Sequence, residues 1–365
     1  MARRLAVLAW VVVAGASQSG CYYLQAATGQ VDILVRREPI DEVLADPETD
    51  IDVARRLRLV QEARDFSVAT LGLPDNGSYR SYAELDRDYV VWSVFAAPEF
   101  RMQAVNWCYP IVGCVSYRGY FKQEKAEREA RRLSERGFDV HVGGVAAYST
   151  LGRFDDPVLS TMMRWDDAQL VATLFHELAH QVLYIPDDTR FNESFARAVE
   201  EFGMERFLLA RDAGSALAAY RDGKALRTEL ATLVEQTRDD LSAMYAETLD
   251  DDEKRLLKEH RLEQLSAALR ALLEGAGRDA DAWLSAPLNN ARLLSISLYE
   301  GRLPAFRRMI EDCAGEIECF YAEAGRVAAM PSDERNRYLD ALASRGDGAE
   351  GVTATSWSRS RRVSP

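Results

Sequence analysis

The chain has 365 residues, of which 47% are hydrophobic and 28% are charged. This is an ordinary composition for a globular protein, and the length suits one large or two modest domains. The net charge is −13 and no basic stripe crosses the body of the chain, which excludes nucleic acid as an expected partner. Acidity of this size indicates solubility rather than a substrate preference.

The N-terminus has the pattern of an export signal. Arg3 and Arg4 precede an apolar run at residues 5–16, which is the right length for a signal peptide and short for a membrane span. The run ends in S-Q-S-G-C, which resembles a bacterial lipobox except that Gln18 stands where an aliphatic residue is usual.

Processing at this site would remove residues 1–20 as a signal peptide and leave Cys21 as the new, lipid-bearing N-terminus. The lipid would hold the chain on the periplasmic side of a bacterial membrane. Secretion with cleavage near Ala16 and an uncleaved anchor are the alternatives, and all three export the chain.

Export to an oxidising compartment makes disulfides expected. Apart from Cys21, the cysteines form two local pairs, Cys108 with Cys114 and Cys313 with Cys319. Four cysteines allow three connectivities, and sequence does not choose among them. Local pairing is the simplest interpretation, four free buried thiols are the alternative, and the spacing is not that of a zinc ribbon.

The N-terminal half, residues 21–150, predicts an α+β region. Apolar residues recur at helical spacing in two segments, and β-branched or aromatic residues mark two others as strands. The aromatic stretch 107–121 predicts a hairpin stapled by its two cysteines, and Tyr117, Arg118 and Tyr120 would alternatively line a substrate cleft. The helical segments are 24–35 and 51–73, and the strand segments are 79–82 and 89–95.

Residues 138–150 predict one or two further strands, followed by a short strand at 158–163. The part around 147–149 would offer an exposed edge to which an extended substrate adds by β-pairing. His141 lies in the first of these segments. We interpret this isolated histidine as structural rather than as a metal ligand.

Residues 176–180 read H-E-L-A-H within an apolar helical pattern. His176 and His180 are four apart, so they share one helical face and can reach one metal ion. Glu177 is then placed to act on a water molecule that the metal activates. The flanking residues are apolar on every side, which predicts a buried helix, so structural histidines in a core helix are the weaker alternative.

A catalytic zinc site needs a third protein ligand. Glu193, in F-N-E-S-F-A, is the candidate, because a turn and a second helix fit between it and His180. Glu200 lies two turns further on the same face and would orient a ligating histidine, with direct ligation as its alternative role. Glu201 and Glu205 are expected on a solvated helix face.

The remainder predicts a mainly helical lobe, residues 151–345, followed by a Ser- and Arg-rich disordered tail, residues 346–365. The lobe holds a long helical hairpin with its turn near 250–252. Leucines in both arms, Leu256 among them, are expected to pack inward. One more helix is expected over 288–310.

H-E-x-x-H followed by N-E-x-x-A resembles the gluzincin metallopeptidases, in which the second motif's glutamate is the third zinc ligand. The wider pattern is similar to a bacterial family described as putative aminopeptidases, which implies a zincin-like catalytic lobe. Arg197 stands where gluzincins often carry an acidic residue that orients the first histidine, and no G-A-M-E-N-like segment is present. The likeness rests on G-C-Y-Y-L-Q-A-A-T-G-Q, W-C-Y-P-I-V-G-C-V-S-Y-R-G-Y-F, A-Y-S-T-L-G-R-F-D-D-P and N-N-A-R-L.

These patterns predict a peptide hydrolase of the aminopeptidase type with one Zn²⁺ per chain. His176, His180 and Glu193 would hold the ion, and Glu177 would be the general base. Tyr299 is the expected oxyanion partner, from its position in the helical lobe. The alternatives are a zinc endopeptidase and a non-catalytic zinc-stabilised lipoprotein that binds peptides or cell-wall fragments.

Overall fold

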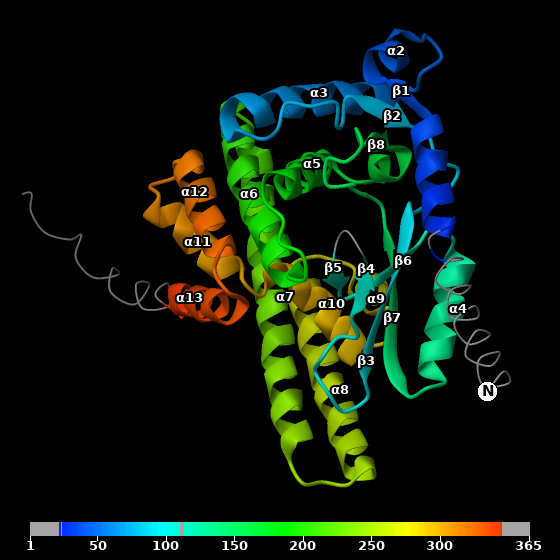
Figure 1. Cartoon of the computed structure of the whole chain (residues 1–365), viewed down its shortest axis with the longest axis vertical. Helices are drawn as coiled ribbons and strands as arrows, with labels where there is room; N and C mark the ends of the chain where they lie inside the picture. Colours follow the sequence, from blue (N-terminus) through cyan, green and yellow to red (C-terminus); the bar gives the residue numbers. More distant parts are fainter. Residues whose placement is uncertain (1–21, 23, 110–112, 345–365) are drawn as a thin grey trace, which may run out of the picture.

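The computed structural model describes residue 22 and residues 24–109 and 113–344, without the side chains of Tyr299 and Glu300. The expected signal peptide, Cys21 and the tail from residue 346 lie outside this part of the chain. The described residues form many helices and small sheets of two or three strands, mostly N-terminal, which confirms the α+β class (Figure 1). None of these helices is both long and apolar enough to cross a lipid bilayer.

The first helical residues, 24–35, pack on the body through the face that carries Gly29 and Ile33. Gly29 and Ile33 are buried, whereas Leu24, Val31 and Val35 are exposed. Gln25 fixes the helix to the neighbouring strand, since its side chain donates to the Gly119 carbonyl and accepts from the Phe121 N–H. The prediction of a helix is confirmed, but Leu24, Val31 and Val35, whose spacing indicated it, lie on the outer face of that helix.

A long helix, α3, lies across one end of the molecule beside a small sheet (Figure 1). Asp50 caps it by accepting hydrogen bonds from the N–H groups of Asp52 and Val53, and Gly72 ends it at a φ of 61°. In the sheet, β2 pairs antiparallel with β1 and parallel with β8. The bounds are β1 Arg37–Pro39, α2 Ile40–Ala45, α3 Ile51–Leu71, β2 Ser81–Ala83 and β8 Val158–Leu159, with a 3₁₀ turn at Ser160–Arg164.

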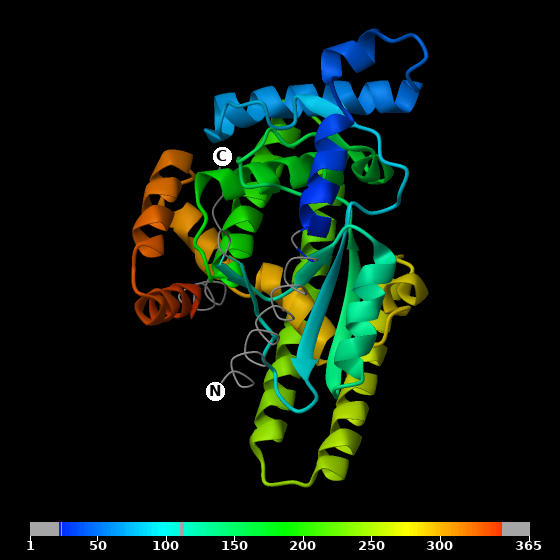
Figure 2. The same ribbon diagram turned by 45° about the vertical axis from the view of Figure 1, so that its right-hand side comes forward.

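The second sheet has the order β6-β3-β7, with β3 paired antiparallel on both sides. Helix α4 packs on one face and helix α10 (Asn290–Glu300) on the other (Figure 2). The cysteine hairpin β4-β5 sets Cys108 opposite Cys114, and the two form a disulfide. The bounds are β3 Val91–Pro98, β4 Trp107–Tyr109, β5 Gly113–Val115, β6 Arg118–Tyr120, α4 Gln123–Ser134 and β7 Phe138–Val145.

Strand β7 is an edge strand, and it ends at Val145. The expectation of strand structure at 147–149 is therefore wrong. Asp156 holds the following segment instead, because its carboxylate accepts hydrogen bonds from the Thr150 N–H at 2.7 Å and hydroxyl at 2.9 Å. These side-chain bonds replace the ladder that a strand would need.

His141 lies on β7 opposite Phe95, and their rings are 6.2 Å apart. Burial, aided by the charge of Arg292, lowers the pKa of His141 from 6.5 to about 4. The unfolded chain therefore binds more protons than the folded chain between these pH values, so this residue removes stability as the pH falls from 6.5 to 4. Urea unfolding at pH 7 and pH 5 should show a smaller loss for His141→Asn than for wild type. Equal losses would contradict this account.

The metal-motif helix α5 packs against α6 and α3 at the centre of the largest hydrophobic core. That core runs from Ile33 to Leu342 in the sequence, so the N-terminal half and the helical lobe share one interior. Phe175 of α5 contacts both Phe66 of α3 and Phe207 of α6. The bounds are α5 Asp167–Val182 and α6 Thr189–Ala210.

Helices α7 (Gly214–Ala246) and α8 (Asp251–Gly275) form a hairpin that projects from the body (Figures 1 and 2). Asp250 and Glu253 close a capping box at the start of α8. Leu265 and Leu269 pack inward as expected, but Leu256 is 68% exposed. The expectation for Leu256 is wrong because the hairpin tip extends beyond the elements that would cover it.

The N-N-A-R-L segment ties this hairpin to the sheet. Asn289 caps α10, and the Asn290 side chain donates to the carbonyl of Glu99 at 2.9 Å. Asp139 accepts from the Asn290 N–H and from Lys258 Nζ of α8 at 2.6 Å. The bounds are α9 Ala280–Leu284, α10 Asn290–Glu300 and α11 Leu303–Asp312, so the helix expected over 288–310 is two helices.

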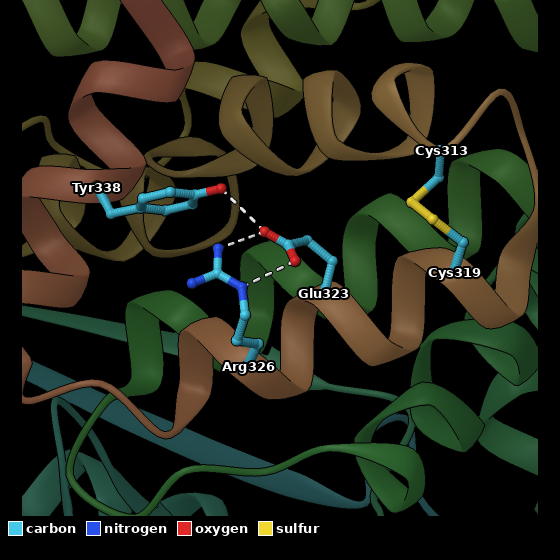
Figure 3. Close-up of a disulfide and its surroundings, with 5 residues drawn as sticks. All are labelled: Cys313, Cys319, Glu323, Arg326 and Tyr338. Carbon is cyan, nitrogen blue, oxygen red and sulfur yellow. Dashed lines mark hydrogen bonds and ion pairs between the residues drawn. A yellow bond between two sulfur atoms is a disulfide. The ribbon is translucent and has the colours of Figure 1, made fainter.

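The C-terminal helices α11, α12 (Ile317–Ala328) and α13 (Ser332–Ser344) form a small layer, in which α11 packs on α6. A disulfide between Cys313 and Cys319 links α11 to α12 (Figure 3). Glu323 of α12 accepts hydrogen bonds from Arg326 and from the Tyr338 hydroxyl of α13. The two local cysteine pairs are thus the pairs that the structure contains.

Candidate metal centre

A tight turn brings the start of α6 beside the H-E-L-A-H face of α5. Asp188 caps α6 by accepting from the Phe191 N–H. The Asn192 side chain accepts from the Ile185 N–H at 2.8 Å and donates to its carbonyl at 2.7 Å. Asn192 therefore closes the turn that places Glu193 opposite the histidines, a role that sequence reasoning missed although the residue precedes the ligand candidate.

The structure brings His176, His180 and Glu193 together. Glu193 Oε2 lies 3.2 Å from His176 Nε2 and 3.7 Å from His180 Nε2. One ligand atom from each residue lies within 4.8 Å of the others, and both histidines are buried. Two imidazole nitrogens and a carboxylate oxygen match the ligand set of a catalytic zinc site with an open position.

The electrostatics of this group favour a positive charge. Burial alone would lower the pKa of His176, but hydrogen bonds to Glu193 and Glu200 outweigh it and raise the pKa to about 10. Burial opposes ionisation of Glu193 as well, yet the two histidines hold its pKa well below the usual range. The donor set and its charges therefore fit a divalent cation that prefers nitrogen and oxygen ligands.

Glu200 contacts the opposite side of the His176 ring. Its Oε2 lies 3.3 Å from His176 Nδ1, and its Oε1 accepts from Arg197 at 2.6 Å. Glu200 is not in the group whose atoms could share one ion. It can therefore set the orientation and basicity of the histidine while Arg197 holds it in place. The acidic partner absent from position 197 is supplied one turn later.

Replacing this partner should weaken metal binding without removing a ligand. We expect Glu200→Gln to lower zinc affinity about 10–100-fold, because an amide attracts the Nδ1 proton of His176 less than a carboxylate does. Competition with a zinc-binding dye measures the change. Glu205→Gln, on the same helix, is the matched control. An affinity equal to that of wild type in Glu200→Gln would refute the orienting role.

Glu201 is buried, which contradicts the expectation of a solvated helix face. It is 4% exposed, and its carboxylate pairs with Arg307 at 2.8 Å and Lys224 at 3.1 Å. The difference arises because α7 and α11 cover this side of α6. Glu205, one turn further, is partly exposed and lies 3.5 Å from Lys224.

Glu177 lies beside the metal group in the wall of a cavity of about 1530 Å³. Burial, the largest influence, raises the pKa of Glu177 against the opposing effect of the two histidines. The walls come from the first helix, the cysteine hairpin, residues 144–151 and α7. The segment 147–149 thus lines the cleft although it is not a strand. A carboxyl group so placed can exchange a proton with a bound substrate.

Two tyrosines from other elements border the metal group. Tyr117, from the segment after the hairpin, lies half-buried beside Phe95, and its pKa is raised by desolvation and by the charges of Glu193, Tyr184 and Glu177. Tyr184 follows α5, and its ring lies 6.4 Å from that of His180. The side chain of Tyr299, the expected oxyanion partner, lies outside the described residues. In the sequence, a cleft wall at Tyr117, Arg118 and Tyr120 is the alternative to a stapled hairpin, and no pattern points to Tyr184. Tyr117 lines the cleft, whereas Arg118 and Tyr120 are not among the cleft residues.

Taken together, the fold and the site define a mainly helical α+β protein with a His-His-Glu metal-binding group in a large cleft. The family model described as "Putative aminopeptidase" matches residues 21–339, so the chain belongs to that family. Membership supports a peptidase-like hydrolytic function. No curated protein and no solved structure matches the chain.

Proposed function

We propose that this protein is a zinc-dependent aminopeptidase. The observation that carries the proposal is the arrangement of His176, His180 and Glu193, whose ligand atoms lie within 4.8 Å of one another, with Glu177 beside them in the cleft. Family membership supports hydrolysis of peptides, and the donor set supports zinc. The aminopeptidase specificity rests on the family description.

Few side chains would carry out the proposed peptide hydrolysis, and each would have a separate role. Zinc, when bound by His176, His180 and Glu193, would activate water and polarise the scissile carbonyl. A carboxylate oxygen of Glu177 would accept the proton of the attacking water and pass it to the leaving amine. The Tyr117 hydroxyl would donate a hydrogen bond to the oxygen on which negative charge develops. The apolar and aromatic cleft walls would exclude bulk water.

The experiment is a metal analysis of the purified protein together with peptide assays. We expect about one zinc per chain and cleavage of peptides with a free N-terminus. N-terminally acetylated versions of the same peptides should resist cleavage. Equal cleavage of blocked peptides would make the enzyme an endopeptidase. If the protein binds zinc but cleaves no member of a diverse peptide library, the aminopeptidase proposal is wrong and the non-catalytic lipoprotein is the better account.

We also propose that the protein is exported and anchored through a lipid on Cys21. The support is the lipobox-like sequence before Cys21 and the position of the first helix, whose Tyr22, Ala26 and Gln30 line the cleft. The cleft would then open near the membrane surface. Cells grown with labelled palmitate should label the wild-type chain, whereas Cys21→Ala should carry no label. A labelled Cys21→Ala chain would refute the anchor.

A further inference from the structure

One face of α7 forms a wall of the cleft at some distance along the chain from the zinc motif. Three small residues, Ala216, Ala219 and Gly223, leave room along this wall. Two polar side chains, Tyr220 and Arg227, stand on the same face, because residues seven apart lie two turns above each other. An arginine and a tyrosine therefore stand among small residues on this wall of the cleft.

Arg227 has hydrogen-bonding capacity that the described residues do not use. Its Nε and Nη2 atoms are buried without a hydrogen-bond partner among these residues. The Tyr220 hydroxyl is also buried and also has no hydrogen-bond partner among them. The Arg227 guanidinium lies 5.8 Å from the centre of the Tyr220 ring. The described residues offer Arg227 no ion pair within 4.0 Å either. Three donors near one another thus lack an acceptor.

The two carboxylates whose charges act on Arg227, Glu200 and Glu201, already pair with other side chains. Glu200 pairs with Arg197 and His176, and Glu201 pairs with Arg307 and Lys224. Burial, followed by the nearby charge of Arg197, lowers the pKa of Arg227 against the opposing charges of Tyr220, Glu200 and Glu201, and its buried Nε and Nη2 atoms have no partner among the described residues. A buried cation without a partner is costly in free energy, and a ligand that supplies negative charge would remove this cost.

We propose that Arg227 and Tyr220 form a subsite that binds a carboxylate of the substrate. A guanidinium presents parallel N–H groups that match the two oxygens of a carboxylate, and the tyrosine hydroxyl adds a third donor. The carboxylate is either the C-terminus of a short peptide or an acidic side chain. This inference rests on the proposed function, because it describes the substrate of the same cleft.

The test measures peptide binding rather than cleavage, so the contribution of the subsite is determined separately from catalysis. Zinc-loaded Glu177→Gln protein is titrated with three tripeptides: Ala-Ala-Ala with a free C-terminus, its C-terminal amide, and the amide of Ala-Glu-Ala. A hydrogen-bonded charge pair should strengthen binding about 10–100-fold over the neutral amide. Preference for the first peptide identifies the C-terminus as the source, and preference for the third identifies the side chain. Equal affinity for all three overturns the inference.

Arg227→Gln in the same background should reduce the affinity ratio between charged and neutral peptides to about one. Tyr220→Phe removes only the hydroxyl and should reduce the ratio several-fold. This milder variant still tests the subsite if Arg227→Gln does not fold. Arg221→Gln changes an exposed arginine of α7 that lies 3.7 Å from Glu205, and it should keep the full ratio. A full ratio in Arg227→Gln would overturn the subsite. Absence of peptide cleavage by wild-type protein would instead overturn the proposed function. The binding titrations would still show whether Arg227 and Tyr220 bind a carboxylate.

Discussion

Replacing Glu177 with glutamine should abolish peptide hydrolysis while leaving zinc in place. The amide has nearly the same shape but cannot accept the proton of an attacking water, and general acid–base catalysis contributes about 10²–10⁴-fold to such reactions. We therefore expect kcat to fall by about 10²–10⁴-fold. The residue is not among the three whose atoms could share the ion, so zinc content should remain that of wild type.

The measurement is kcat on one free tripeptide, paired with metal analysis of the same samples. Glu205→Gln makes the same chemical change on the neighbouring helix α6, at a partly exposed carboxylate that pairs with Lys224, and should retain wild-type activity. If Glu177→Gln keeps both zinc and activity, the general base is a different group. If it loses zinc, Glu177 holds the metal rather than moving a proton.

Replacing Glu193 with alanine should remove zinc binding and with it the stability that zinc confers. The change deletes a ligand outright, so the affinity loss should exceed the roughly 10–100-fold expected for an outer partner such as Glu200. Zinc at about 100 times its dissociation constant stabilises a protein that binds only in the folded state by about 2.7 kcal/mol. Wild type should gain this stability on adding zinc after chelation, and Glu193→Ala should gain almost none.

Urea unfolding with and without zinc measures this difference, and Glu205→Gln should respond to zinc like wild type. Zinc-dependent stabilisation of the Glu193→Ala protein equal to that of wild type would mean that the third ligand lies elsewhere in the chain. The same titration should show an intermediate response for Glu200→Gln, since that variant keeps all three ligands and loses only the partner of His176 Nδ1.

Features that depend on short separations along the chain follow from the amino-acid sequence alone. The four-residue spacing of His176 and His180 places both on one face of any α-helix. The six-residue separation of Cys108 and Cys114 suits a hairpin, and the structure contains that disulfide. The α+β class follows in the same way, from alternating and helical periods of apolar residues.

Features that depend on which elements meet do not follow from such local patterns. Glu201 and Glu205 look alike in the sequence, and only the packing of α7 and α11 on α6 decides that Glu201 is buried. Leu256 fits the inward stripe of a hairpin arm, but the tip has no partner among the described residues and leaves it exposed.

The sequence by itself determined the helical face of H-E-L-A-H and the presence of a carboxylate candidate close behind it, because both follow from local helix geometry. Tertiary structure decided what surrounds that face. It brought Tyr117 from the hairpin and Arg227 from α7 into the same cleft, and it set Glu200 against His176. Such contacts join residues far apart in the chain, where no short period in the sequence records which surfaces will pack together.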